Sequence, residues 1–290
     1  MLNIHNNFTF KCCPVCTQDT TYKVGNINYS LPTYFSSQEI SVNTQPTLWR
    51  CKSCKSGFVQ NIIPEKIATY LYTNSSADKR WSSSKFTESK CQEVIKALDA
   101  IFHSGSSVLD IGCNTGELLD YAKEKNCKTF GVEYSLTSRT VLKSKGHTAY
   151  GNLLEANDCY DIITAFDLIE HLYDLPSFLD VCHEKISNNG YLVLLTGNIN
   201  SISSLVTNSK WWYVSYPEHI IFPSKHYFKS NPKFKLQAWI PTYASKYFKR
   251  SWLFFIERFT KSCLLNKYNG FPSIGKDHIL IILKKCLSDD

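Results

Sequence analysis

The segment Ser106–Ser135 reads SSVLDIGCNTGELLDYAKEKNCKTFGVEYS. An apolar run ends in an acid, Asp110, and a turn that contains Gly112 and Gly116 follows it. A stretch with helical spacing comes next, and a second apolar run ends in another acid, Glu133. This order predicts a strand, a tight turn, a helix and a second strand. The two acids would then lie at the carboxyl ends of strands, where open α/β sheets bind their ligands.

The chain beyond this segment keeps alternating between strand and helix patterns. TAYGN, YDIITAFDLIEHL, NNGYLVLLTGN, FKLQAWIP and DHILIILKK contain strand-like runs, and SRTVLKSKG and LPSFLDVCHEKIS have helical spacing. Such alternation predicts an α/β fold with a doubly wound, mostly parallel seven-stranded sheet and helices on both faces. The last strand follows a long insertion, which would let it enter the sheet antiparallel.

The turn after the first strand favours a ligand with a cationic group over a pyrophosphate. GCNTG does not match the G-x-G-x-x-G pattern of dinucleotide-binding turns. Gly112 and Gly116 allow the backbone to turn tightly and approach a ligand. Asp110 would repel a phosphate and suit an ammonium group, and Glu133 is placed to accept hydrogen bonds from ribose hydroxyls.

VLDIGCNTG followed by GVEYS resembles motif I and the acidic second motif of class I S-adenosylmethionine-dependent methyltransferases. FDLIEHLYDLPSFLDVCHEKISNNGYLVLLTGN is similar to the fourth strand and the segment after it in the same superfamily, although Asn114 replaces the middle glycine of motif I. The resemblance implies that the methionine end lies at motif I, the ribose at Glu133, the adenine at Asn152 and the sulfonium at Asp167. The cofactor-binding residues implied are Asp110, Gly112, Cys113, Asn114, Gly116, Glu133, Tyr134, Asn152, Leu153, Phe166 and Asp167.

Two Glu-His pairs supply candidate catalytic residues, Glu170 with His171 and Glu218 with His219. Methyl transfer requires alignment of donor and acceptor and, for a hydroxyl acceptor, removal of a proton. A carboxylate beside an imidazole can orient the ring and raise its basicity. His171 and His219 are therefore both candidate bases, and the alternative is that each ring only bonds a backbone carbonyl or caps a helix. Tyr216 would be a second proton-relaying residue if the acceptor were a carbon atom.

A further hypothesis places a divalent cation such as Mg²⁺ at Asp167, Glu170 and His171. These residues resemble the D/E-x-x-E-H arrangement of ubiquinone-type O-methyltransferases, where such groups can bind a divalent cation.

Two C-x-x-C pairs near the N-terminus, Cys13 with Cys16 and Cys51 with Cys54, predict a structural zinc site. Each pair suits a tight knuckle, and the Thr-, Tyr- and Asn-rich stretch between them suits the short strands of a zinc ribbon. Cys12 is an alternative to Cys13, but Pro14 favours Cys13. A site with four cysteines has no open position, which indicates a role in folding.

These features predict three regions: a zinc-ribbon module (1–62), a helical linker or lid (63–104) and a methyltransferase core (105–290). In the linker, Tyr70 and Tyr72 precede a polar run, so Tyr72 is a candidate to cover the cofactor. The insertion at about 241–275 has aromatic and basic residues at helical spacing. It is expected to cap the acceptor pocket, and the alternative is a basic amphipathic helix on a membrane surface.

The bulk composition is that of a globular protein expected in the cytoplasm, with 290 residues, 43% hydrophobic and 20% charged, and the cytoplasmic expectation rests on the following two observations. The N-terminal stretch does not match a signal peptide, and no apolar run reaches membrane-spanning length. Reducing conditions in the cytoplasm then make the twelve cysteines metal ligands or buried side chains rather than disulfides. The membrane alternative would place the protein at the inner face of the membrane. The net charge of +7 mildly favours anionic partners.

The sequence favours O-methylation of a sugar hydroxyl with a histidine base. The layout of cysteine ribbon, IEHL and PEHI resembles methyltransferases of bacterial sugar and surface-polysaccharide pathways, such as O-antigen and capsule, which act on nucleotide-linked sugars or glycan ends. C-methylation of a keto-sugar nucleotide is one alternative, and a non-catalytic cofactor-fold scaffold is another. RNA methylation is a third, but no N-P-P-Y-like tetrad follows the fourth strand and no dense Lys/Arg stripe marks a phosphate track, so nucleic acid is not an expected partner.

Overall fold

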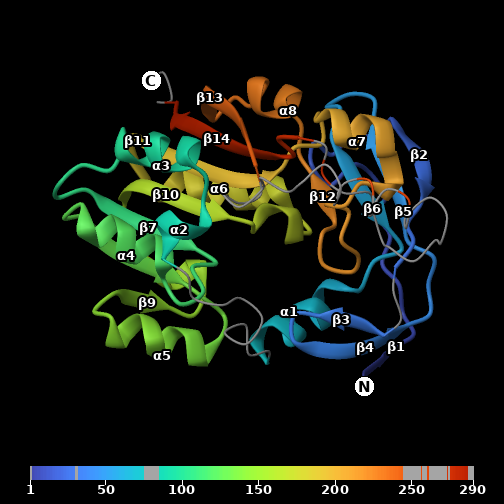
Figure 1. The fold of residues 1–290 in the computed structure, drawn as a ribbon, viewed down its shortest axis with the longest axis horizontal. Helices are drawn as coiled ribbons and strands as arrows, with labels where there is room; N and C mark the ends of the chain where they lie inside the picture. The colour runs from blue at the N-terminus through green and yellow to red at the C-terminus, as the bar shows by residue number, and fades with distance from the viewer. Residues whose placement is uncertain are drawn as a thin grey trace.

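The computed structural model describes residues 2–29, 32–74, 85–243, 256, 260, 273 and 275–286. Within them, seven strands form one sheet in the order β13-β14-β11-β10-β7-β8-β9 (Figure 1). The strands from β7 to β11 run parallel, and β14 runs antiparallel to both β11 and β13. The predicted seven-stranded, mostly parallel sheet with an antiparallel last strand is confirmed. The strands are β7 (Ser107–Ile111), β8 (Lys128–Val132), β9 (Thr148–Tyr150), β10 (Tyr160–Phe166), β11 (Ile186–Gly197), β13 (Phe234–Thr242) and β14 (His278–Lys285).

Helices cover both faces of this sheet because successive strand residues point to opposite faces. Val108 and Ile162 belong to a cluster with α3 and α4, whereas Leu109 and Ile163 belong to a larger cluster with α6. The helices of this part of the chain are α2 (Phe86–Ser89), α3 (Gln92–Asp99), α4 (Glu117–Glu124), α5 (Leu136–Ser144), α6 (Leu175–Lys185), α7 (Ile202–Thr207), α8 (Lys225–Lys229), η2 (Leu153–Glu155), η3 (Ile169–His171) and η4 (Asn208–Lys210).

Among its described residues, the N-terminal part adds two small sheets and one helix at the side of the molecule opposite α4 and α5 (Figure 1). One sheet has the order β1-β4-β3 and the other has the order β12-β6-β5-β2. β12 comes from the core, so Ile221 and Phe222 pair with Phe58 and Gly57 of the N-terminal part. The elements are β1 (Leu2–Ile4), β2 (Thr21–Asn26), β3 (Thr33–Phe35), β4 (Gln38–Val42), β5 (Thr47–Cys51), β6 (Gly57–Gln60), α1 (Glu65–Thr73) and β12 (Ile221–Phe222).

The expected insertion at 241–275 lies largely outside the described residues. Its first two residues, Pro241 and Thr242, belong to β13. Among the described residues, no helix has both the length and the apolar character that crossing a bilayer requires.

Candidate active site and metal centre

The turn between β7 and α4 takes the unusual backbone conformation that the sequence suggested. Gly112, Asn114 and Gly116 have φ values of 74°, 47° and 87°. Positive φ is easy for glycine and more tolerable for asparagine than for most residues, which explains how Asn114 can replace a glycine. A Cβ at Gly116 would also lie 2.6 Å from Leu142 Cδ2. The side chain of Cys113 packs inward, with its Sγ against the backbone of Gly131, so only its backbone faces the turn.

Asp110 is the last residue but one of β7, and its carboxyl group is buried, with the residue 5% exposed. Thr164 Oγ1, on the neighbouring strand β10, donates to Asp110 Oδ1 at 2.7 Å. Burial raises the pKa of Asp110 to about 7, although the Thr164 hydrogen bond opposes this shift. The group is therefore poised to ionise when a cationic ligand arrives.

Glu133, at the end of β8, joins the second strand to the turn. Its carboxylate accepts hydrogen bonds from Asn114 N at 3.0 Å and from Ser135 N at 2.8 Å. Each N–H occupies a different oxygen, so each oxygen keeps a lone pair for a further donor such as a ribose hydroxyl. Burial raises the pKa of Glu133, and the two backbone hydrogen bonds oppose the shift. The structure thus brings the two predicted acids to one edge of the sheet.

An exposed apolar group lies beside Glu133. Tyr134, Leu136 and Leu154 are 50%, 70% and 75% exposed. The first two follow the end of β8, and Leu154 follows the end of β9. Asn152 holds the turn after β9, since its Oδ1 accepts from Leu154 N at 3.0 Å. The predicted Leu153 is only partly exposed and packs on the core, whereas its neighbour Leu154, which the sequence analysis did not mark, is largely exposed.

Asp167 follows β10 with a φ of 50°. Lys90 Nζ lies 2.9 Å from Asp167 Oδ2 and 6.0 Å from the centre of the Phe166 ring. Desolvation would raise the pKa of Asp167, but the surrounding basic groups, Lys90 first among them, together lower it. Asp167 therefore stays charged, and Lys90 is a residue of the site that no sequence pattern had marked.

Glu170 lies in η3 and is completely buried. Tyr213 Oη donates to Glu170 Oε1, and Thr196 Oγ1 donates to Oε2 at 2.9 Å. The proposed cation ligands Asp167 and Glu170 thus have different partners. The three residues here with the spacing of metal ligands are instead Glu170, His171 and His219, whose ligand atoms lie within 4.8 Å of one another. Asp167 is not part of this cluster, so the predicted set of Asp167, Glu170 and His171 does not come together, and Tyr213 and Thr196 already hold the Glu170 carboxylate.

His219 has its tautomer set by the backbone. Its Nδ1 lies 2.7 Å from the carbonyl oxygen of Tyr213. A carbonyl oxygen can only accept, so Nδ1 carries the proton and Nε2 of the neutral ring keeps its lone pair. Burial, followed by the nearby His171, lowers the pKa of His219. The ring is therefore neutral near pH 7 and can accept a proton.

His171 lies against His219, with ring centroids 4.9 Å apart. Its Nδ1 is 2.9 Å from Tyr72 Oη and 3.0 Å from the carbonyl oxygen of Glu218. The Glu218 carboxylate in turn accepts from Ser36 N at 2.5 Å. The N-terminal part thus contributes to this region twice, through Ser36 after β3 and through Tyr72 in α1, on the predicted linker.

Tyr216 is buried against Tyr29, with ring centroids 5.0 Å apart. Its hydroxyl has no hydrogen-bond partner within the part of the chain that the structure describes. Burial raises the pKa of the Tyr216 hydroxyl, so it would act as a proton donor rather than as a base.

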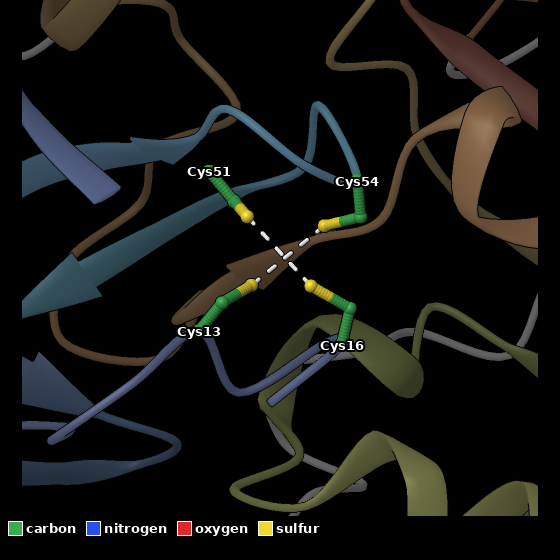
Figure 2. Close-up of side chains that lie close together, drawn as sticks. All are labelled: Cys13, Cys16, Cys51 and Cys54. Atoms are coloured by element: carbon green, nitrogen blue, oxygen red, sulfur yellow. Dashed lines mark hydrogen bonds between the residues drawn. The ribbon is translucent and has the colours of Figure 1, made fainter. Parts of the chain in front are cut away.

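The four predicted zinc ligands converge on one point (Figure 2). The Sγ atoms of Cys13 and Cys54 are 3.7 Å apart, and those of Cys16 and Cys51 are 3.6 Å apart. Four thiolates around a tetrahedral zinc ion, with zinc–sulfur bonds of about 2.3 Å, would have sulfurs about 3.8 Å apart. The geometry therefore fits a zinc ion, and Cys12 lies outside this cluster.

The sequence also matches known proteins. A family model described as a methyltransferase domain matches residues 84–231, about half of the chain. The ubiquinone biosynthesis O-methyltransferases of Rhodopseudomonas palustris strains BisB5 and TIE-1 are 29% and 30% identical over 120 residues, which cover 38% of this chain and 47% of each relative. The chain thus matches about half the length of these curated relatives.

A solved structure supports the fold alone. A chain in the complex of the Haloferax volcanii Trm112 methyltransferase activator with a methyltransferase is 11% identical and gives a TM-score of 0.53 over 76% of this chain and 98% of that chain. Together with the motif turn, the two strand-end acids and the match over residues 84–231, the seven-stranded sheet places the chain in the class I S-adenosylmethionine-dependent methyltransferase family.

Proposed function

We propose that the protein transfers a methyl group to a hydroxyl oxygen of a small-molecule acceptor, with His219 as the general base. The observation that carries this proposal is the 2.7 Å contact between His219 Nδ1 and the Tyr213 carbonyl, which leaves Nε2 free to accept a proton. The names of the curated O-methyltransferase relatives are consistent with an oxygen acceptor.

When bound, S-adenosylmethionine supplies an electrophilic methyl group on a sulfonium. Asp110 would pair with its ammonium and Glu133 would hold its ribose. His219 Nε2 would take the hydroxyl proton as the oxygen–carbon bond forms and the carbon–sulfur bond breaks, which leaves S-adenosylhomocysteine and methylated acceptor. The acceptor class that we favour is a nucleotide-linked or glycan sugar, which rests on the resemblance of the cysteine ribbon, IEHL and PEHI to sugar methyltransferases.

C-methylation of a keto-sugar nucleotide is a second candidate, and the pairing of Tyr72 with His171 favours it. The 2.9 Å contact joins a phenol to an imidazole that lies against His219. Such a chain could move a second proton, which abstraction from a carbon next to a ketone requires.

We also propose that the cysteine cluster binds a structural zinc ion that folds the N-terminal module, residues 1–62. The linker, residues 63–104, would then place Tyr72 beside His171, and the catalytic core would span residues 105–290. The convergence of the four sulfurs supports the zinc site.

The test is methyl transfer from S-adenosylmethionine labelled with ¹⁴C in its methyl group to a panel of nucleotide sugars, with His219→Asn beside the wild type. Asparagine can still donate to the Tyr213 carbonyl but has no base, so we expect turnover to fall about 10²- to 10⁴-fold with unchanged cofactor affinity. His103→Asn, at an exposed histidine, is the matched control. Full activity of His219→Asn would contradict the assignment of the base.

The same panel separates the two acceptor types. Enzyme-catalysed exchange of a carbon-bound hydrogen for deuterium in a keto-sugar nucleotide, with S-adenosylhomocysteine in place of the methyl donor, would favour C-methylation. A labelled methyl ether without such exchange would favour O-methylation.

A further inference from the structure

A third histidine, His278, lies at the same edge of the sheet and was not marked by any motif. His278 is the first residue of β14 and pairs with Gly197, the last residue of β11. Because β14 is antiparallel, its first residue lies at the edge where the parallel strands end. β14 is two strands away from β10, about 10 Å at ordinary strand spacing, on the side away from the β8 acid Glu133.

The imidazole of His278 is 6% exposed. It lies nearly parallel to the Trp212 ring, with centroids 5.7 Å apart, and edge-on to Tyr213 at 4.9 Å. Trp212 Nε1 donates to Asp277 Oδ2 at 2.6 Å, which fixes the indole. The imidazole of His278 thus packs against two aromatic side chains, Trp212 and Tyr213, of the loop that also carries His219.

Neither ring nitrogen of His278 has a hydrogen-bond partner among the residues that the structure describes. Burial lowers the pKa of His278, and Lys90 acts in the same direction against Asp167, Glu170 and Asp277. The neutral ring offers one N–H and one lone pair. Leaving both unpaired in a buried position costs free energy, which a binding site can tolerate because its ligand pairs them.

We propose that His278 binds a hydroxyl group of the acceptor other than the one that is methylated. A hydroxyl both donates and accepts, so it complements a neutral imidazole. The strands that carry Asp110 and Glu133, β7 and β8, lie on one side of β10 in the sheet. His278 lies on the other side, together with Tyr213 and His219, and we call this region the acceptor side. The inference rests on the proposed function and specifies the acceptor as polyhydroxylated, as a nucleotide-linked hexose is.

The test uses protein with ¹⁵N-labelled histidine, saturated with S-adenosylhomocysteine and titrated with UDP-glucose and TDP-glucose, with UDP and TDP as controls. The NMR signals of His278 are assigned from His278→Phe, which keeps a stacked ring and removes both nitrogens. We expect the His278 ring signals to shift with a nucleotide sugar but not with the free nucleotide. His278→Phe should weaken nucleotide-sugar binding about 10-fold or more and leave the affinity for S-adenosylhomocysteine unchanged.

His278→Phe should also raise the unfolding temperature of the ligand-free protein, because it removes two unpaired buried polar atoms. A lower unfolding temperature would show that the imidazole is paired structurally, for example to a buried water, and would overturn the inference. Shifts at His171 or His219 without a shift at His278 would overturn it too and leave the proposed function standing. If no histidine responds to either nucleotide sugar, both the sugar acceptor and this inference fail.

Discussion

Near neutral pH, the carboxyl group of Asp110 is present in both its protonated and its ionised form. It is buried at the end of β7, and its pKa of about 7 is far above that of a solvated aspartate. A buried acid of this kind gains most from a ligand that brings a positive charge. In the proposed site that charge is the ammonium group of S-adenosylmethionine.

The titration of Asp110 near pH 7 predicts a pH dependence of cofactor binding. Only ionised Asp110 pairs with an ammonium group, so affinity should rise about fivefold between pH 6 and pH 7 and level off above about pH 8. Asp110→Asn should bind more weakly and without this pH dependence. Isothermal titration of S-adenosylmethionine between pH 5.5 and 8.5 checks both, and a pH-independent affinity in the wild type would contradict the assigned role.

The same carboxyl group affects stability in the opposite direction. Between pH 4 and pH 7 folded Asp110 holds a proton that the unfolded chain has released. Its contribution to the free energy of unfolding therefore falls as pH rises through this window and is constant above pH 7. Chemical denaturation of the wild type and of Asp110→Asn over this range should show the difference in slope.

At the scale of elements, the end of β11 and the loop after it hold the acceptor side together. Gly197 ends β11, and a Cβ built on it would overlap the Tyr213 ring. Tyr213 in turn donates to Glu170, and its carbonyl sets the tautomer of His219. The absence of a side chain at residue 197 thus allows Tyr213 and the loop that contains it to lie against β11.

Gly197→Ala should therefore displace Tyr213 and lower the free energy of unfolding by about 1–3 kcal/mol. Turnover should fall as well, because His219 would lose its fixed tautomer. Gly275→Ala is the matched control, since no described atom lies within 4 Å of a Cβ there. Equal stability of the two variants in denaturant titrations would show that the overlap at residue 197 is relieved without cost.

The cysteine cluster belongs to the N-terminal elements and offers a separate prediction. The purified protein should contain one zinc ion per chain by elemental analysis. Cys16→Ser should lose the metal and lower the free energy of unfolding by more than about 2 kcal/mol, whereas Cys159→Ser, at an exposed cysteine, should keep it. A folded wild-type protein that contains no zinc, and whose thermal stability does not change when a chelator is added, would contradict this account.

At the scale of the whole molecule, the sequence predicts the core well because its signals are local. The strand and helix periods, the glycine turn and the two C-x-x-C knuckles each lie within a few residues of one another. Their physical causes, backbone conformation and one-sided burial, act over the same short range. The fold class and the two cysteine knuckles were therefore accessible from the sequence. That the knuckles meet across 41 positions followed instead from the four ligands that a tetrahedral zinc ion requires.

The acceptor side was less accessible because its contacts join residues far apart in the chain. Tyr72 meets His171 across 99 positions, and Tyr213 meets Glu170 across 43. β12 is only two residues long and joins the N-terminal part by pairing with β6. The place of His278 depends on how β14 aligns with β11, and an apolar strand pattern does not specify that register.

Binding of S-adenosylmethionine to the wild type and to Glu133→Ala tests the central claim most directly. Isothermal titration should give micromolar affinity for the wild type and a loss of about 1–3 kcal/mol for the variant, which is about 5- to 150-fold. Glu124→Ala, at an exposed acid, should bind like the wild type, and thermal unfolding should show all three proteins folded. A folded, zinc-loaded wild type that binds no S-adenosylmethionine would contradict the assignment of this chain as a working methyltransferase.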